Sequence, residues 1–201
     1  MSPLRPGTFT LVAFAGELSL ILVAWLAVWL WPEPPLLIPE WDLEALLWGA
    51  LAALPPLSLL FWMLSPGGQD LEFVGRIRSV LSEHIGGTVA SLQLWQMALI
   101  ALAAGIGEEV LFRGALQPRM GLLLTSLLFG LLHPFTLAYA VIVTAFGLYL
   151  GWLQEKGGNL LLPITTHAIY DFVALWAVRR DLRRGESEGG PAEGPQRDSG
   201  P

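Results

Sequence analysis

The sequence contains no cysteine, a single lysine and few charged residues of any kind. The absence of cysteine excludes a disulfide framework, a thiolate metal site and a cysteine nucleophile. Charged residues make up 14% of the 201 residues, whereas soluble domains average about 25%. The net charge of −6 leaves no basic surplus that would indicate a nucleic acid partner. The composition therefore excludes a water-soluble enzyme, a disordered protein and a collagen-like chain.

Long apolar stretches are what the chain does contain. Hydrophobic residues make up 54% of it, and its mean hydropathy is +0.58. A helix needs about 20 mostly apolar residues to cross a bilayer. We predict an all-α fold, a polytopic transmembrane helix bundle with about six spans: Thr8–Trp31, Ala45–Leu64, Leu92–Gly107, Met120–His133, Phe135–Leu153 and Leu160–Val178.

Two segments of the N-terminal half have patterns of their own. Pro55-Pro56 removes two backbone donors near the middle of the second span, so we expect a kink there. Apolar residues fall on one face of the segment Leu71–Ile85, which is the pattern of an amphipathic helix lying in the membrane interface. Gly86-Gly87 should end that interfacial helix.

The chain divides into three parts. Residues 1–91 hold the first two spans and the interfacial helix, and residues 92–178 hold the four remaining spans, the expected catalytic core. Residues 179–201 contain almost no apolar side chain, so we expect a disordered polar tail from Arg179. Arginine and lysine are more frequent on the side that holds both termini. This bias places the termini of a multi-pass integral membrane protein in the cytoplasm.

Polar residues that are costly to bury in a membrane occur in the second half of the chain. An Asp, Arg or Lys at the centre of a spanning helix costs about 2.5–3.5 kcal/mol on insertion. Such residues are therefore candidates for function. The set consists of Glu108, Glu109, Arg113, His133, His167 and Asp171.

The spacing around the two glutamates predicts different roles for them. Glu109 and Arg113 are four residues apart, so they share a helix face and can form an ion pair. Glu108 lies about 100° round the helix from that pair. A carboxylate free of the pair is a candidate general base. The alternative is a helix end at the membrane surface, where both glutamates face water.

The two histidines lie in different settings. His167 and Asp171 are four residues apart, so Asp171 can orient the imidazole. His133 precedes Pro134 at the end of a span, where it either takes part in chemistry or caps the last carbonyls. Packed helices would bring the whole set to one polar centre. Such a centre either activates a water with Glu and His or holds a divalent metal such as zinc, here through Glu108, His133 and His167.

Three short motifs occur in order on separate predicted spans: Glu108-Glu109-x-x-x-Arg113, Phe129-x-x-x-His133 and His167-x-x-x-Asp171. In this order they resemble the CPBP (Abi-type) family of intramembrane proteases, which is related to the CAAX prenyl endopeptidase, the Ras-converting enzyme. The resemblance covers about Leu92 to Val178. The stretch EEVLFRGALQ is especially similar to bacterial members.

The resemblance implies a helical bundle with an active site inside the membrane and an endopeptidase, a hydrolase acting on peptide bonds, that needs no cofactor. It implies that Glu108 activates a water with help from His133. It also implies that His167 binds the developing oxyanion together with Asp171. A zinc-dependent reaction is the alternative.

The resemblance also implies supporting roles. Glu109 and Arg113 would stabilise the geometry of the site, and Phe129 would position the substrate. The family often has Asn where this chain has Asp171. An ionised Asp accepts hydrogen bonds but cannot donate one to an oxyanion. Asp171 is therefore either protonated, used to orient His167, or part of a metal site.

The expected partners are the lipid bilayer and a membrane-associated peptide or protein substrate, lipidated or not, and no nucleic acid. Ten arginines against one lysine are typical of a high-GC bacterium, so we expect the bacterial inner (plasma) membrane. Two other classes of function stay open. One is a non-catalytic membrane partner or immunity protein on the same fold. The other is an ion or metal carrier that uses the same polar centre.

Overall fold

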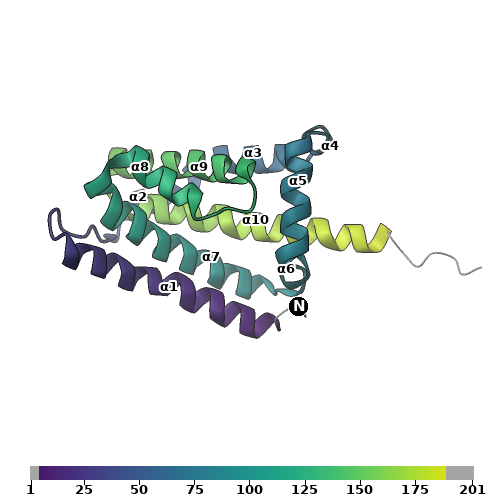
Figure 1. Cartoon of the computed structure of the whole chain (residues 1–201), viewed down its shortest axis with the longest axis horizontal. Helices are drawn as coiled ribbons and strands as arrows, with labels where there is room; N and C mark the ends of the chain where they lie inside the picture. Colours follow the sequence, from purple (N-terminus) through teal and green to yellow (C-terminus); the bar gives the residue numbers. More distant parts are fainter. Residues whose placement is uncertain (1–4, 189–201) are drawn as a thin grey trace, which may run out of the picture.

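The computed structural model describes residues 5–188, and every regular element in this range is helical. Figure 1 shows α7 between α1 and α10, α8 beside α9, and α5 running across one end of the bundle. In chain order the elements are α1 (Pro6–Leu30), α2 (Leu43–Ala52), α3 (Leu54–Leu64), α4 (Pro66–Gln69), α5 (Glu72–Leu81), the π-helical turn η1 (Ser82–Gly86), α6 (Gly87–Ser91), α7 (Leu94–Glu109), the π-helical turn η2 (Val110–Leu116), α8 (Gln117–Leu131), α9 (Leu137–Gly157) and α10 (Leu161–Glu188).

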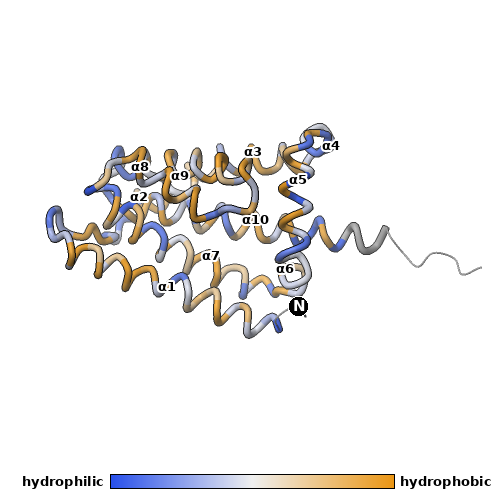
Figure 2. The backbone as a smooth tube through the Cα atoms, in the orientation of Figure 1, coloured by the Kyte–Doolittle hydropathy of each residue, from blue (hydrophilic) through white to orange (hydrophobic). Residues whose placement is uncertain are grey.

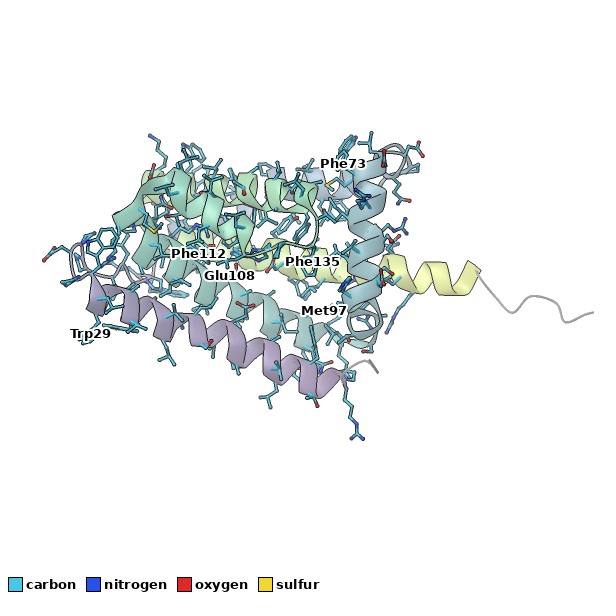
Figure 3. The ribbon with its side chains drawn as sticks, viewed as in Figure 1. Trp29, Phe73, Met97, Glu108, Phe112 and Phe135 are labelled. Carbon is cyan, nitrogen blue, oxygen red and sulfur yellow. The ribbon has the colours of Figure 1, made fainter. Side chains whose placement is uncertain are left out.

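Among residues 5–188, four helical segments are long and apolar enough to cross a membrane. Their outward faces carry large hydrophobic side chains, and Figure 2 shows apolar residues along most of α1, α3 and α9. In Figure 3, Glu108 and Phe112 lie inside the bundle, whereas Trp29 lies at its edge. The four segments are Pro6–Leu30, Leu43–Leu64, Leu137–Gly157 and Leu161–Arg183. The all-α architecture is confirmed, with these four segments as candidate membrane spans, whereas the expected count of about six spans is not.

The two remaining predicted spans are not among these four segments. α7 has 16 residues and leads directly into η2, which carries a buried arginine. α8 is interrupted at Gly121, whose φ of 78° and ψ of 164° are not helical. The helix after Gly121 extends about 15 Å at 1.5 Å per residue, which is half of a hydrocarbon core of roughly 30 Å. α8 therefore does not cross a bilayer by itself.

Two features of the N-terminal half bear on the sequence predictions. The helix is interrupted at Ala53, and Pro55 and Pro56 follow in the first turn of α3, so a break occurs close to the place where the kink is predicted. The predicted end of the amphipathic helix at Gly86-Gly87 is wrong, because η1 and α6 continue it to Ser91. A Cβ added to Gly86 would lie 3.3 Å from Ser82 Oγ and 3.5 Å from Leu182 Cδ1 of α10, so Gly86 lies close to α10. The interfacial position stays a prediction.

The last helix extends further than the sequence predicts. α10 continues to Glu188, so the prediction of disorder from Arg179 is wrong for residues 179–188. Tertiary contacts explain the difference: Asp181 pairs with Arg78 at 2.6 Å, and the Arg183 guanidinium donates to the Ala90 carbonyl. The rest of the predicted tail, residues 189–201, lies outside the described residues.

A close approach of α7 and α10 places the site. A Cβ added to Gly105 would lie 3.0 Å from the Ile164 carbonyl oxygen and 3.1 Å from the Ala168 Cβ. Only glycine lets the two backbones come this near. Since Glu109 lies one turn after Gly105 and His167 directly precedes Ala168, the contact brings their side chains within reach of each other.

Candidate active site

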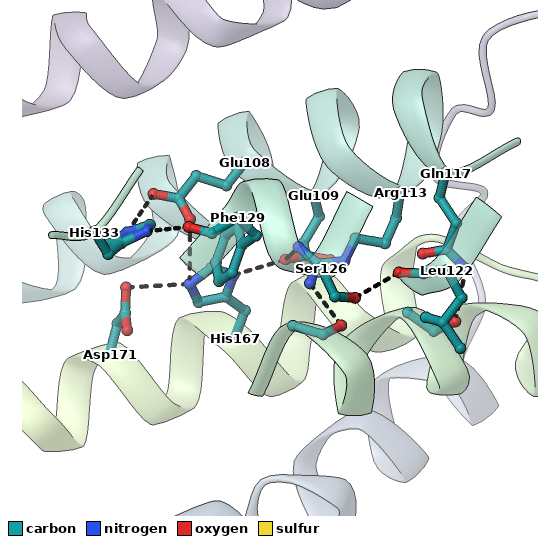
Figure 4. A network of polar contacts seen from close by, with 12 residues as sticks. Glu108, Glu109, Arg113, Gln117, Leu122, Ser126, Phe129, His133, His167 and Asp171 are labelled. Carbon is teal, nitrogen blue, oxygen red and sulfur yellow. Dashed lines mark hydrogen bonds and ion pairs between the residues drawn. The ribbon is translucent and has the colours of Figure 1, made fainter. Parts of the chain in front are cut away.

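Separate elements bring the six predicted polar residues into one network (Figure 4). Each residue has an oxygen or nitrogen within 3.8 Å of an oppositely charged or ionisable partner in the set. The helices therefore gather these residues into one polar centre. It comprises Glu108 and Glu109 at the end of α7, Arg113 in η2, His133 just after α8, and His167 and Asp171 one turn apart in α10.

Glu109 lies at the centre of the buried half of the network. Its Oε1 accepts a hydrogen bond from Arg113 Nη1 at 2.9 Å and another from His167 Nδ1 at 2.8 Å. Glu109 is 0% exposed and Arg113 is 1% exposed. Removing one partner of a buried pair leaves an uncompensated charge, which costs about 3–5 kcal/mol. The pair is therefore a candidate for holding the fold and the site together.

Arg113 is fixed from several directions. Its Nη2 donates to the Gly147 carbonyl of α9 at 2.9 Å, and its guanidinium carbon lies 4.6 Å from the centroid of the Phe129 ring. A Cβ added to Gly147 would lie 3.4 Å from Nη2. The absence of a side chain at Gly147 therefore leaves room for the guanidinium beside this carbonyl. η2 has π-helical geometry, which is often found at functional sites. From this turn, the Arg113 side chain reaches both Glu109 and the Gly147 carbonyl.

Glu108 has different surroundings from Glu109. Its Oε1 lies 3.8 Å from His133 Nε2, and its Oε2 lies 3.8 Å from His167 Nε2. These distances exceed those of direct hydrogen bonds, and Oε2 is buried without a hydrogen-bond partner among the described residues. Glu108 is thus a buried carboxylate that faces two imidazoles without being bound by either.

The contacts of His133 fix the position of its proton. Its Nδ1 lies 2.8 Å from the Phe129 carbonyl oxygen, which can only accept. Nδ1 therefore donates this hydrogen bond, and the lone pair of Nε2 in the neutral ring faces Glu108. The sequence left open whether His133 caps the helix or faces the polar centre. In the structure it does both.

The network is closed at one side and open at the other. The side chains of His133 and Asp171 are 27% and 29% exposed, whereas that of His167 is nearly covered. Asp171 Oδ2 lies 3.5 Å from His167 Nε2, at the open side. The alternative in which both glutamates simply face water is wrong, because Glu108 and Glu109 are both buried. A ligand would reach Glu108 from the side of His133 and Asp171.

Aromatic rings surround the histidines. Phe129 is buried, and its ring centroid lies 4.9 Å from that of His133 and 6.0 Å from that of His167. Phe129 thus packs behind the imidazoles, and its expected role in positioning substrate stays a prediction. Phe146 of α9, which the sequence did not single out, contacts His167 edge to face at 5.5 Å. An apolar residue within an apolar span gives no pattern that would distinguish it.

The geometry of the polar centre also bears on the zinc alternative. Within residues 5–188, no group of three or more His, Asp or Glu side chains is arranged to hold a metal ion. The two imidazoles approach different oxygens of Glu108, and His167 Nδ1 is already bound to Glu109. Glu108, His133 and His167 as placed here do not fit a metal site.

Comparison with known proteins identifies the same segment. Residues 90–173 match the family model described as type II CAAX prenyl endopeptidase Rce1-like. The uncharacterized protein YpbD of Bacillus subtilis (strain 168) is 40% identical over 83 residues, which cover 40% of this chain and 44% of that protein. The chain thus spans less than half the length of this curated relative. No solved structure matches the chain.

The matched segment holds all six residues of the polar centre and Phe129. It also coincides closely with the stretch on which the three motifs resemble a protease family. The predicted resemblance to the CAAX prenyl endopeptidase family is therefore confirmed for residues 90–173.

Proposed function

We propose that this chain is an intramembrane endopeptidase that hydrolyses a peptide bond of a membrane-associated substrate with a water activated by Glu108 and His133. The observation that carries this proposal is the difference between the adjacent glutamates. Glu109 is bound by Arg113 and His167, whereas Glu108 faces two imidazoles without a direct hydrogen bond to either. The Rce1-like match over the same segment supports the same reaction class.

The first step is the attack of water on the scissile carbonyl. The 3.8 Å between Glu108 Oε1 and His133 Nε2 suits a water that donates to both atoms. Glu108 takes one proton from this water as general base, and the oxygen forms a bond to the carbonyl carbon. Because His133 Nδ1 is committed to the Phe129 carbonyl, Nε2 keeps its lone pair directed at the water.

The second step is collapse of the tetrahedral intermediate. Its oxyanion needs hydrogen-bond donors placed in advance. His167 offers Nε2–H in its imidazolium form, in which both ring nitrogens donate and Nδ1–H stays bound to Glu109. The C–N bond then breaks, and Glu108 returns its proton to the leaving nitrogen. The products are a carboxylic acid and an amine, so one water is consumed per bond. Asp171, 3.5 Å from Nε2, orients His167 for this role.

The substrate approaches from the open side of the network. His133 and Asp171 are its partly exposed members, and apolar faces of the surrounding helices point outward. A peptide held in or on the bilayer can therefore present its scissile bond to Glu108. A lipid on the substrate would add to its membrane affinity, and nothing in this mechanism requires one.

Cleavage of a membrane-peptide library by the purified protein in liposomes tests the proposal. We expect products from the wild type and from Glu83→Gln, a control that alters an exposed glutamate of η1, but none from Glu108→Gln. Addition of a chelator should leave the rate unchanged. Cleavage by folded Glu108→Gln would contradict the mechanism. Absence of cleavage by every variant would favour the non-catalytic membrane partner.

A further inference from the structure

A second polar feature lies away from the active site, toward the C-terminal end of α10. A cavity of about 370 Å³ opens there between α10 and the first turn of α7. On α10, Trp176 precedes Arg179 and Arg180 by three and four residues, and Arg183 follows them by four and three, so the four side chains share one helix face. The basic pocket, as we name it, is lined by Leu94, Trp176, Arg179, Arg180 and Arg183.

The positive charge of the basic pocket is not neutralised by the acidic residue nearest in sequence. Asp181 pairs with Arg78 of α5 instead. Arg180 lies over the Trp176 ring at 5.5 Å, and Arg183 donates to the uncharged carbonyl of Ala90. The Nε atom of Arg179 is buried with no hydrogen-bond partner among the described residues. Three guanidinium groups therefore face one cavity with donors to spare.

The basic pocket lies where a membrane would end. The candidate span of α10 runs from Leu161 to Arg183, so the three arginines occupy its last turns, at the level of the lipid headgroups. Tryptophans such as Trp176 are typical of that level. Leu94 is the first residue of α7, and the dipole at a helix N-terminus favours an anion. The basic pocket thus combines positive charge, a position at the level of the lipid headgroups and apolar side chains.

We propose that the basic pocket binds the phosphate of an anionic phospholipid from the surrounding leaflet. Arginine forms paired hydrogen bonds with phosphate oxygens, and basic pockets between membrane helices bind anionic headgroups. The source is a lipid and not free phosphate because Leu94 and Trp176 supply an apolar wall beside the arginines. An acyl chain can lie along this wall, whereas an inorganic ion would leave it uncovered.

Binding of defined lipids to the delipidated full-length protein in detergent tests this proposal. Dissociation constants would be measured for phosphatidylglycerol, for phosphatidylcholine and for inorganic phosphate. We expect phosphatidylglycerol to bind at least tenfold more tightly than the other two. Arg179→Gln with Arg180→Gln should weaken phosphatidylglycerol about 30-fold, from about fivefold per arginine at a membrane surface. Arg180→Gln alone, at an exposed position, should weaken it about fivefold and serves if the double variant fails to fold.

The matched control removes two charges elsewhere. Arg5→Gln with Arg76→Gln changes two exposed arginines outside the basic pocket and should leave phosphatidylglycerol binding within twofold of the wild type. Equal binding of phosphatidylglycerol and phosphatidylcholine would overturn the proposal. So would equal losses in the control and in the Arg179 and Arg180 variants. Inorganic phosphate that binds as tightly as the lipid would overturn the assignment of a lipid.

Discussion

The polar centre has a closed half, Glu109 and Arg113, and an open half, Glu108, His133 and Asp171. Each half contains one glutamate, and the two carboxylates have different surroundings. Glu109 is fully buried and receives hydrogen bonds from Arg113 and His167. Glu108, the preceding residue, is buried beside two imidazoles but is bound by neither at hydrogen-bond distance. A helix turns about 100° per residue, so neighbours in the sequence meet different partners. One carboxylate can therefore stabilise the site while the other remains available for proton transfer.

His167 connects the two halves. Its Nδ1 donates to Glu109 in the closed half, and its Nε2 faces Glu108 and Asp171 in the open half. The buried pair fixes the ring, and the other side of the ring faces the position where a substrate would bind. Loss of the closed half should thus disturb the chemistry indirectly, whereas loss of the open half should leave the fold intact.

The largest change in stability is expected in the closed half. Glu109→Gln leaves the buried Arg113 without a charged partner, which should lower the free energy of unfolding by about 3 kcal/mol or more. The melting temperature of the purified protein in detergent measures this loss, with Glu83→Gln as a control at an exposed glutamate. An unchanged melting temperature would show that the Glu109–Arg113 pair does not stabilise the bundle.

The open half should respond in activity and not in stability. His133→Ala removes the acceptor for the attacking water and should lower kcat about 10²–10⁴-fold, with little change in melting temperature because His133 is partly exposed. His84→Ala is a matched control, since His84 Nδ1 bonds the Val80 carbonyl as His133 Nδ1 bonds that of Phe129, both at 2.8 Å. Equal kcat values for the two variants would exclude His133 from the reaction.

Asp171, in the open half, provides a smaller test. Asp171→Ala removes the acceptor beside His167 Nε2 and should lower kcat about 10–100-fold, as loss of a group that orients a functional histidine does. Asp171→Asn keeps an oxygen acceptor and should retain most of the activity. Single-turnover rates of both variants distinguish these outcomes. A loss in Asp171→Asn as large as in Asp171→Ala would mean that the charge is required.

The smallest effect is expected far from the polar centre. Arg78→Gln removes the ion pair with Asp181 that links α5 to the end of α10. Because both side chains are partly exposed, with 44% and 25% of their surfaces accessible, the loss should stay below about 1 kcal/mol. Chemical denaturation measures it. A loss as large as that of Glu109→Gln would mean that surface and buried pairs contribute equally here.

The sequence predicted the polar centre better than it predicted the helices. Costly residues in apolar stretches and spacings of four identified the Glu109–Arg113 and His167–Asp171 pairs without any knowledge of packing. The break at Gly121 and the π-helical turn η2 were not predicted. The contacts of Arg113 in η2 depend on tertiary packing, since its guanidinium donates to the Gly147 carbonyl only once α9 is packed against η2.

The end of the last helix shows the same limit. The polar composition after Val178 predicted disorder, yet contacts of Asp181 with Arg78 and of Arg183 with Ala90 accompany a helix that continues to Glu188. Partners more than 90 residues away in the chain leave no local pattern. The sequence did not predict that Phe146 contacts His167. The neighbours of Phe146 in α9 are also mostly apolar, so no local pattern distinguishes it.

The different roles of the two glutamates are tested most directly by comparing Glu108→Gln with Glu109→Gln in one liposome preparation, by cleavage rate and by melting temperature. We expect Glu108→Gln to lose cleavage at least 100-fold and to keep the wild-type melting temperature. We expect Glu109→Gln to have the lower melting temperature of the two. A folded Glu108→Gln protein that cleaves at the wild-type rate would contradict the assignment of Glu108 as the base.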